Sequence, residues 1–233
     1  MVLWRSLGVI TLLVVLTAPP AKAQMGRVPL TALASTAVGQ VANSPIVFAN
    51  QDGITTSFLA APVVSATSST SLSDNQQWLK IEFHYAVAPQ KIPFLDSVEF
   101  KVWVEGRDLY AANAPGDQGV SVLLTGSVTY INLPKTSDGY GVFYLHPSTM
   151  TRYSTSRGYE DFDRKFNIHI MALVGGQEVD HYDKFKDQQG SDWYKGIPTL
   201  IPNLVYRQDQ SPFVLTDVMR YPQMKLQTSG ASQ

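Results

Sequence analysis

The feature that most constrains this chain is the strict alternation of apolar and polar side chains in short stretches after residue 77. In Trp78–Val87 every second residue from Leu79 onward is apolar, and mostly charged residues lie between them. A period of two is the period of a β-strand, whose successive side chains point to opposite faces of a sheet. The pattern therefore predicts strands with one face in a core and the other in water.

Further stretches predict more strands of the same kind. They are Ser97–Glu105, Val120–Ile131 and Tyr140–Leu145. Gly126 interrupts the second of these and predicts a bulge or a bend. Leu200–Tyr206 and Phe213–Met219 have a weaker pattern.

Two of the expected strands form a hairpin. Phe166–Val174 and Gln177–Tyr182 flank Gly175-Gly176, and a two-residue type I′ turn needs positive φ at both central positions. Near the end of the chain, Phe213–Met219 could form a short helix and not a strand. Ser211-Pro212 would begin this helix, because serine caps helices and proline suits their first position.

The sequence predicts an all-β fold, an antiparallel β-sandwich of immunoglobulin-like or jelly-roll-like topology. Six or more short strands are expected, and no helical stripe runs for more than a couple of turns. A closed barrel is the alternative. The chain has no cysteine, so the sandwich has no disulfide, and thiolate metal sites and cysteine nucleophiles are excluded.

The first residues have the features of a signal peptide. Met1–Ala23 holds a cation, Arg5, then the apolar run Leu7–Thr17, and it ends in Ala21-Lys22-Ala23, which fits the A-x-A cleavage rule. We expect the mature chain to start at Gln24 and to be exported, to the periplasm or the extracellular space. The alternative is an uncleaved anchor, but the run is about half the roughly 20 residues of a bilayer span.

The remaining chain divides by composition. Residues 24–77 are rich in Ala, Ser and Thr, which predicts a low-complexity linker, or alternatively a stalk. Two apolar islands within it, Pro45–Ala49 and Phe58–Val64, could be strands that dock on the domain. We expect the β-sandwich domain at 78–224 and a flexible tail at 225–233.

Charge and motifs exclude several classes of function. Eighteen basic and 19 acidic side chains give no basic footprint for nucleic acid. No phosphate-binding glycine motif, zinc-binding HExxH motif or nucleophile elbow occurs, so we expect no cofactor. No stretch after the signal peptide is long enough to cross a bilayer. The partners we expect are an envelope protein or a glycan surface.

Aromatic residues supply the first candidates for a binding site. Trp103 falls on the polar face of its strand, as Trp78 does, and Trp193-Tyr194 lies in a loop rich in glycine and aspartate. Exposed aromatic rings can stack on sugars or anchor a protein interface. The alternative is a second core layer, in which the N-terminal segment or the C-terminal segment covers the polar face.

A second candidate is the stretch that follows Leu145. His146, Arg152 and Tyr153 could form a recognition loop here, although turn chemistry alone explains the proline and hydroxyl residues between them.

Two acidic clusters are candidates for a metal site. Asp180, His181 and Asp183 form one, and the range 160–163 contains the other, which consists of Glu160, Asp161 and Asp163. Lysine and arginine neighbours oppose a divalent cation, so solvated loops are the simpler interpretation. Paired carboxylates could also hydrolyse a glycosidic bond if they lie roughly 5–9.5 Å apart, with His169 or His181 as an accessory base.

These features predict an exported, non-catalytic β-sandwich that acts in binding or assembly at the cell envelope. The alternatives are a carbohydrate-binding module and a secreted hydrolase that uses carboxylates.

Overall fold

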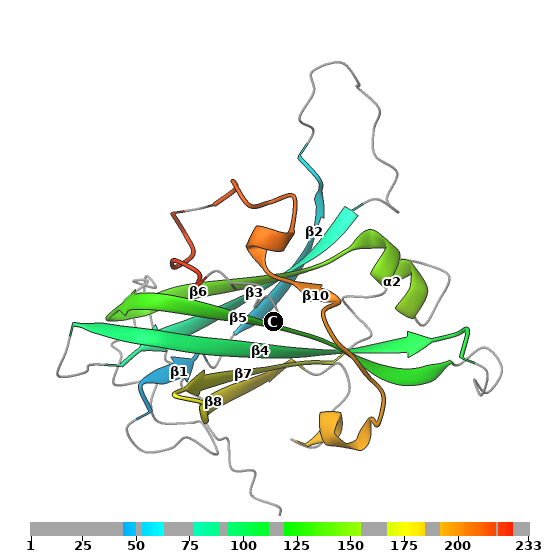
Figure 1. Cartoon of the computed structure of the whole chain (residues 1–233), viewed down its shortest axis with the longest axis horizontal. Helices are drawn as coiled ribbons and strands as arrows, with labels where there is room; N and C mark the ends of the chain where they lie inside the picture. Colours follow the sequence, from blue (N-terminus) through cyan, green and yellow to red (C-terminus); the bar gives the residue numbers. More distant parts are fainter. Residues whose placement is uncertain are drawn as a thin grey trace, which may run out of the picture.

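A computed structural model describes residues 44–49, 53–62, 77–88, 93–111, 119–154, 167–184, 192–217 and 219–225. Strands dominate this part of the chain (Figure 1). Two sheets face each other across a common core, so the predicted β-sandwich is confirmed. The predicted signal peptide, residues 1–23, and the acidic cluster at 160–163 lie outside the described residues.

The first sheet is antiparallel. Two strands, β1 and β2, follow each other along the same edge of β3, and the sheet continues from β3 through β6 to β10. Both β1 and β2 come from the segment predicted as a linker, and β2 begins before the expected island at Phe58. The strand bounds are β1 Ile46–Phe48, β2 Ile54–Ala60, β3 Gln77–Val87, β6 Thr136–Leu145 and β10 Val205–Tyr206.

The second sheet has the order β8-β7-β4-β5-β9. Its pairings are antiparallel except for the short parallel contact of β5 with β9. The long strands β4 and β5 pair over almost their whole length and are the longest strands of the sandwich (Figure 1). The strand bounds are β4 Phe94–Asp108, β5 Val120–Pro134, β7 Ile168–Val174, β8 Gln177–Lys184 and β9 Leu200–Ile201.

The predicted glycine hairpin is present between β7 and β8. Gly175 and Gly176 have φ angles of 60° and 82°, the positive values that the sequence pattern predicted. The turn leaves both glycines exposed at the tip of the sheet.

Aromatic rings fill the centre of the core. Phe100 of the second sheet contacts Phe83 and Tyr85 of the first, with ring centroids 4.8 and 5.0 Å apart. Gly141 lies opposite Phe83 in the first sheet, and a Cβ there would come within 2.0 Å of the Phe83 ring. Because glycine leaves this space open, the tip of the Phe83 ring can approach the backbone of β6 closely.

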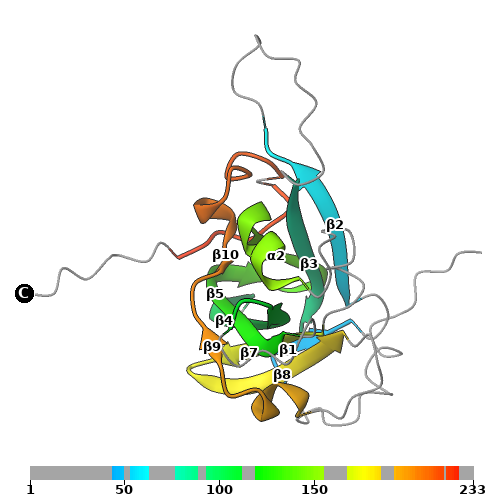
Figure 2. The ribbon, with the colours of Figure 1, turned by 90° about the vertical axis from the view of Figure 1, so that its right-hand side faces the viewer.

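Both open sides of the sandwich are closed by the chain itself (Figure 2). On one side the backbone N–H of Phe48 in β1 donates to Asp180 of β8 at 2.8 Å, and Lys184 donates to Thr56 at the same distance. On the other side residues 200–206 cross between the sheets, because β9 pairs with β5 and β10 pairs with β6. Contacts between the two sheets therefore run along both edges of the sandwich.

Gly126 permits the second closure. The pairing of β4 with β5 passes through Gly126 without a register shift, so the predicted bulge is wrong. A Cβ at this position would lie 2.1 Å from the carbonyl oxygen of Val205. The glycine is there because the backbone of β10 approaches β5 at this point.

The outer face of the first sheet is covered by residues 207–217 and 219–222, which we call the C-terminal strap. Phe213 of the strap stacks on Tyr144 at 4.9 Å and meets the edge of Trp78, which is only 9% exposed. The strap and the sheet face form a second hydrophobic cluster. For Trp78, the alternative of a second core layer under the C-terminal segment is therefore correct.

A buried carboxylate anchors the strap. Glu82 of β3 accepts hydrogen bonds from Arg220 at 2.7 Å and Tyr221 at 2.6 Å, and it pairs with Lys80 at 2.8 Å. Burial opposes its ionisation, but the bonds from Lys80 and Tyr221 and the charges of Lys80 and Arg220 outweigh burial and lower its pKa.

Some local expectations fail near the C-terminal half. The stretch after Leu145, expected as a loop, forms the helix α2 (Pro147–Tyr153). In the weaker strand candidate Phe213–Met219, the described residues 213–217 and 219 form turns and bends after the 3-10 helix η5 (Gln208–Gln210), and no helix begins at Ser211-Pro212. Within the described residues, no helix has the length and apolar character of a bilayer span.

We predict that Gly126→Ala destabilises the sandwich by about 1–3 kcal/mol, because the methyl group would push β10 away from β5. Urea unfolding followed by circular dichroism measures this. Gly196→Ala is the matched control, since nothing lies within 4 Å of its Cβ position. Equal stability of the two variants would contradict the close approach of Val205.

We also predict that acid loosens the strap. Because the pKa of Glu82 is lowered in the folded state, its stabilisation is present above its ordinary value of 4.5 and is lost as the pH falls through the folded value. Glu82→Gln should therefore be less stable than wild type at neutral pH, and this difference should shrink in acid. Glu99→Gln, whose contact with Lys101 is 3.8 Å long, is the control. A difference that does not change with pH would contradict this role.

Candidate functional site

The outer face of the second sheet brings together side chains from four strands. One row runs across the sheet through Asp183, His169, Trp103 and Thr125. A parallel row, one step along the strands, contains His181, Met171, Lys101 and Ser127. Since side chains two residues apart on a strand share a face, the two rows form one surface.

His169 is the buried centre of the first row. Its side chain is 1% exposed, and its Nδ1 forms a 2.8 Å hydrogen bond with Asp183. Its ring stacks on Tyr194 at 4.1 Å and lies 5.3 Å from Trp103. Its Nε2 has no hydrogen-bond partner among the described residues. The ring is thus held rigidly between its neighbours.

The 3-10 helix η4 (Trp193–Gly196) covers this part of the sheet. The indole N–H of Trp193 donates to the same Asp183 oxygen at 3.1 Å, and Tyr194 lies 5.6 Å from Trp103. Lys195 pairs with Asp192 at 2.8 Å across the turn. Burial raises the pKa of Tyr194, which stays neutral at physiological pH. One carboxylate therefore orients both His169 and η4.

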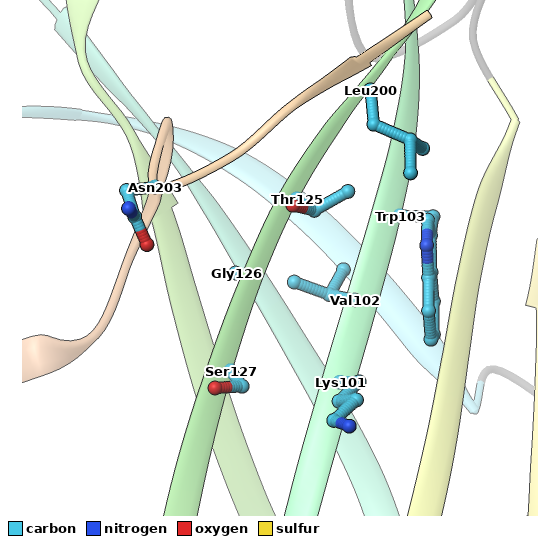
Figure 3. A pocket seen from close by; sticks show the side chains of 8 residues that line it. All are labelled: Lys101, Val102, Trp103, Thr125, Gly126, Ser127, Leu200 and Asn203. Atoms are coloured by element: carbon cyan, nitrogen blue, oxygen red, sulfur yellow. The ribbon is translucent and has the colours of Figure 1, made fainter. Parts of the chain in front are cut away.

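Beside this cluster lies an open groove of about 220 Å³ (Figure 3). Figure 3 shows the indole of Trp103 edge-on, so that one flat face is turned toward the groove while Lys101 and Leu200 lie at its two ends. The lining residues are Lys101, Val102, Trp103, Thr125, Gly126, Ser127, Leu200 and Asn203.

The far rim of the groove is built by the segment that closes the sandwich. Asn203 has a φ of 62°, in the left-handed region that asparagine tolerates better than most residues. This tight turn between β9 and β10 brings the Asn203 amide to the side of the groove opposite Trp103 (Figure 3). The approach of Val205 to Gly126 sets the position of this turn.

Three of the predicted binding residues meet at this surface, and three do not. Trp103, Trp193 and Tyr194 form one cluster. The other three, His146, Arg152 and Tyr153, belong to α2 or its cap. The two groups lie apart: α2 packs beside β3 and β4, whereas η4, the lower of the two orange helical turns, lies at the bottom of both views (Figures 1 and 2).

The residues of α2 have structural contacts. His146 caps the helix by accepting from the Ser148 N–H at 3.1 Å, and its ring meets the edge of Trp78 at 4.7 Å. Tyr153 is buried in the main core. Arg152 is exposed and lies 3.8 Å from Asp108. Packing therefore accounts for two of these three positions.

The acidic cluster on β8 is divided between two faces. Asp183 points outward with His169, whereas Asp180 points to the edge near β1, where it binds the Phe48 N–H. Burial raises the pKa of Asp180. His181 contacts Glu178 at 2.8 Å. Asp180 and Asp183 therefore cannot act as paired carboxylates, and the described residues contain no group of three ligands suited to a metal.

Comparisons with known proteins identify a family. A protein-family model described as ":-like" matches residues 40–228. The chain belongs to this family. The matched range includes both sheets, the C-terminal strap and the groove, and it begins before β1. The family description specifies no ligand, substrate or activity.

One solved structure has a fold similar to that of this chain. A crystal structure of a protein from Akkermansia muciniphila aligns with a TM-score of 0.59 and 17% identity, over 78% of this chain and 92% of that chain. At this identity the likeness shows the fold alone. No curated protein matches the chain.

Several groove residues were not singled out as site residues by sequence reasoning. Thr125 and Ser127 are ordinary outward residues of a strand, and Asn203 belongs to a turn. Lys101 could have been predicted, because it lies two residues before Trp103 and so on the same face of the strand. Lysine is common on any solvent-exposed sheet face, however, so its position alone does not indicate a site. The groove depends on where β9 and β10 cross, which periodicity does not predict.

We predict that Asp183→Ala destabilises the protein by about 1–3 kcal/mol, because His169 and Trp193 would each lose a buried acceptor. Trp193 should become more exposed, so the tryptophan emission should shift to the red. The control is Glu178→Ala, which removes an exposed contact and should change stability by less than about 0.5 kcal/mol. Equal effects would mean that Asp183 does not hold η4 in place.

Proposed function

We propose that this protein is an exported, non-catalytic binding protein of the cell envelope, and that the outer face of its second sheet around Trp103 is the binding surface. The observation that carries the proposal is the two-sided environment of Trp103. The rings of His169 and Tyr194 lie tilted beside the indole, with centroids 5.3 and 5.6 Å away, and one flat face of the indole is turned toward an open groove with mixed polar and apolar lining (Figure 3).

A rigid indole with one free face is suited to recognition. Most side chains lose rotamer freedom when they bind a ligand, but Trp103 is already held by its neighbours, so this loss is small. Aromatic rings of this kind supply a large contact area and often dominate binding energy. The Asp183–His169 pair extends the support to a third strand, and η4 covers it.

The contrast between the two outer faces supports this choice of surface. The C-terminal strap covers the outer face of the first sheet and buries Trp78. On the second sheet, η4 covers the row from Asp183 to His169 and stops at Trp103. To use its first sheet for binding, this protein would have to displace the strap and expose a hydrophobic cluster.

Support for export comes from the sequence. The segment 1–23 has the cation, the apolar run and the small residues of a cleaved signal peptide. The absence of cysteine does not contradict export, because a chain held by its hydrophobic core needs no disulfide.

A non-catalytic role fits the contacts of the ionisable groups. His169 is buried beneath Tyr194, so a substrate in the groove would meet the indole of Trp103 before it met the imidazole. Asp180 and Asp183, the carboxylates considered for a hydrolase, lie on opposite faces of β8. This arrangement supports binding over hydrolysis.

A glycan is the ligand that the groove favours among the partners considered. Thr125, Ser127 and Asn203 provide hydroxyl and amide groups opposite an indole face. Stacking on an aromatic ring combined with such hydrogen bonds matches the amphipathic faces of a sugar. The carbohydrate-binding alternative is therefore the form of the proposal that we pursue below.

We predict that Trp103→Ala reduces the affinity of the mature chain for isolated envelope fragments of its source organism by about 10-fold or more, as expected for an aromatic hot spot. Co-sedimentation of the purified chain with the fragments measures this. Trp78→Phe is the control, because it changes a tryptophan buried under the strap. Unchanged affinity in a folded Trp103→Ala variant would place the binding surface elsewhere.

A further inference from the structure

We infer that the groove beside Trp103 binds a saccharide unit that carries a negatively charged substituent: a carboxylate, a sulfate or a phosphate. This inference rests on the proposed function and adds the class of ligand. It follows from the size of the groove, from the hydrogen-bonding groups in it and from the charge at one end.

The size of the groove fits one sugar ring. Its volume of about 220 Å³ is smaller than the roughly 300–1,000 Å³ of pockets that enclose drug-sized ligands. It is open along one side, between Trp103 and the turn at Asn203 (Figure 3). A single ring could therefore lie against the indole while the rest of a chain continues into solvent.

The walls of the groove provide both donors and acceptors. Thr125 and Ser127 follow each other on the outer face of β5, and each hydroxyl can donate or accept. The amide of Asn203 offers both functions from the opposite rim. Sugar hydroxyl groups also do both, so this set of groups suits a polyhydroxylated ring better than an apolar ligand.

Lys101 supplies the charge. Among the described residues that line the groove, it is the one charged side chain. Its contact with Glu99 is 3.8 Å long, which is too long for a hydrogen bond, and its side chain is 41% exposed. The ammonium protons are therefore available to a ligand, which would share the charge of Lys101 with Glu99, a residue outside the lining of the groove.

The spacing along β4 connects the charge to the stacking face. Lys101 and Trp103 lie two residues apart on the same face, about 6.6–6.8 Å along the strand. The flexible lysine stem can span part of this distance. A ring stacked on Trp103 would therefore carry an exocyclic anionic group into the reach of Nζ, where a charge-assisted hydrogen bond forms.

The groove is also organised before a ligand arrives. His169 and Tyr194 hold Trp103, and the crossing of β10 over Gly126 holds the turn of Asn203. The side chains of the groove therefore lose little conformational entropy when a ligand binds. A shallow groove makes few contacts, so a small entropy loss favours binding.

The test measures affinity by isothermal titration calorimetry, using the mature chain and pairs of oligosaccharides that differ only in charge. One pair is trigalacturonate and neutral α-1,4-galactotriose, and another is a sulfated galactan oligosaccharide and its unsulfated counterpart. We expect the charged member of at least one pair to bind about 10-fold more tightly, as for a hydrogen bond to a charged group. This preference should weaken at high salt.

Variants assign the preference to Lys101. Lys101→Met should remove the preference for the charged member and leave the affinity for the neutral member within about twofold, while Lys101→Arg should keep most of it. Lys135→Met, on the exposed turn after β5, makes the same change in net charge and should have no effect. Circular dichroism confirms that each variant is folded.

The outcomes separate this inference from the proposed function. Equal binding of charged and neutral members, unchanged in Lys101→Met, would overturn the inference and leave a neutral-glycan protein. No binding of any of these probes would also overturn it, and the envelope assay with Trp103→Ala would then decide independently whether the surface binds a partner of another kind.

Discussion

The contact of Phe100 with Phe83 and Tyr85 is the interaction on which the rest of the structure depends. It sets how the second sheet lies on the first, and with it which residues of each strand face outward. Because a strand has only two faces, placing Phe100 in the core places Lys101 and Trp103 on the outside as a direct consequence. The surface that we propose for binding is thus the outer face of the sheet whose inner face carries Phe100 in the aromatic core.

The two outer faces are treated differently by the C-terminal part of the chain. The strap lies across the first sheet and ends in the Glu82 network, so that face becomes a second core. On the second sheet, η4 covers only the histidine and aspartate of the row, and the segment that follows it crosses to the other side. Between the two lies the strip of β4 and β5 that remains open, with Trp103 along its border.

The sequence predicts the layered fold well because burial and strand periodicity report on the same physical quantity. Leu79, Phe83 and Val102 are all buried, as their positions in the alternation require. The glycine hairpin could also be predicted, because two consecutive glycines between two strands favour a turn that needs positive φ at both positions. Gly126 was misinterpreted because a glycine in a strand has two explanations, and only the course of β10 distinguishes a bulge from a close approach. The position of the groove also depends on the course of the chain after β9, because its rim at Asn203 lies 77 residues after Gly126 of β5 in the sequence.

The crossing of residues 200–206 between the sheets determines when the groove is complete during synthesis of the chain. Leu200 and Asn203 belong to the last quarter of the chain, and they form part of the groove only after β9 and β10 have paired with strands synthesised much earlier. A chain that has not yet reached residue 200 therefore lacks two of the residues that line the groove, Leu200 and Asn203. The proposed site is therefore complete only after residues 200–206 have been synthesised and have paired with β5 and β6.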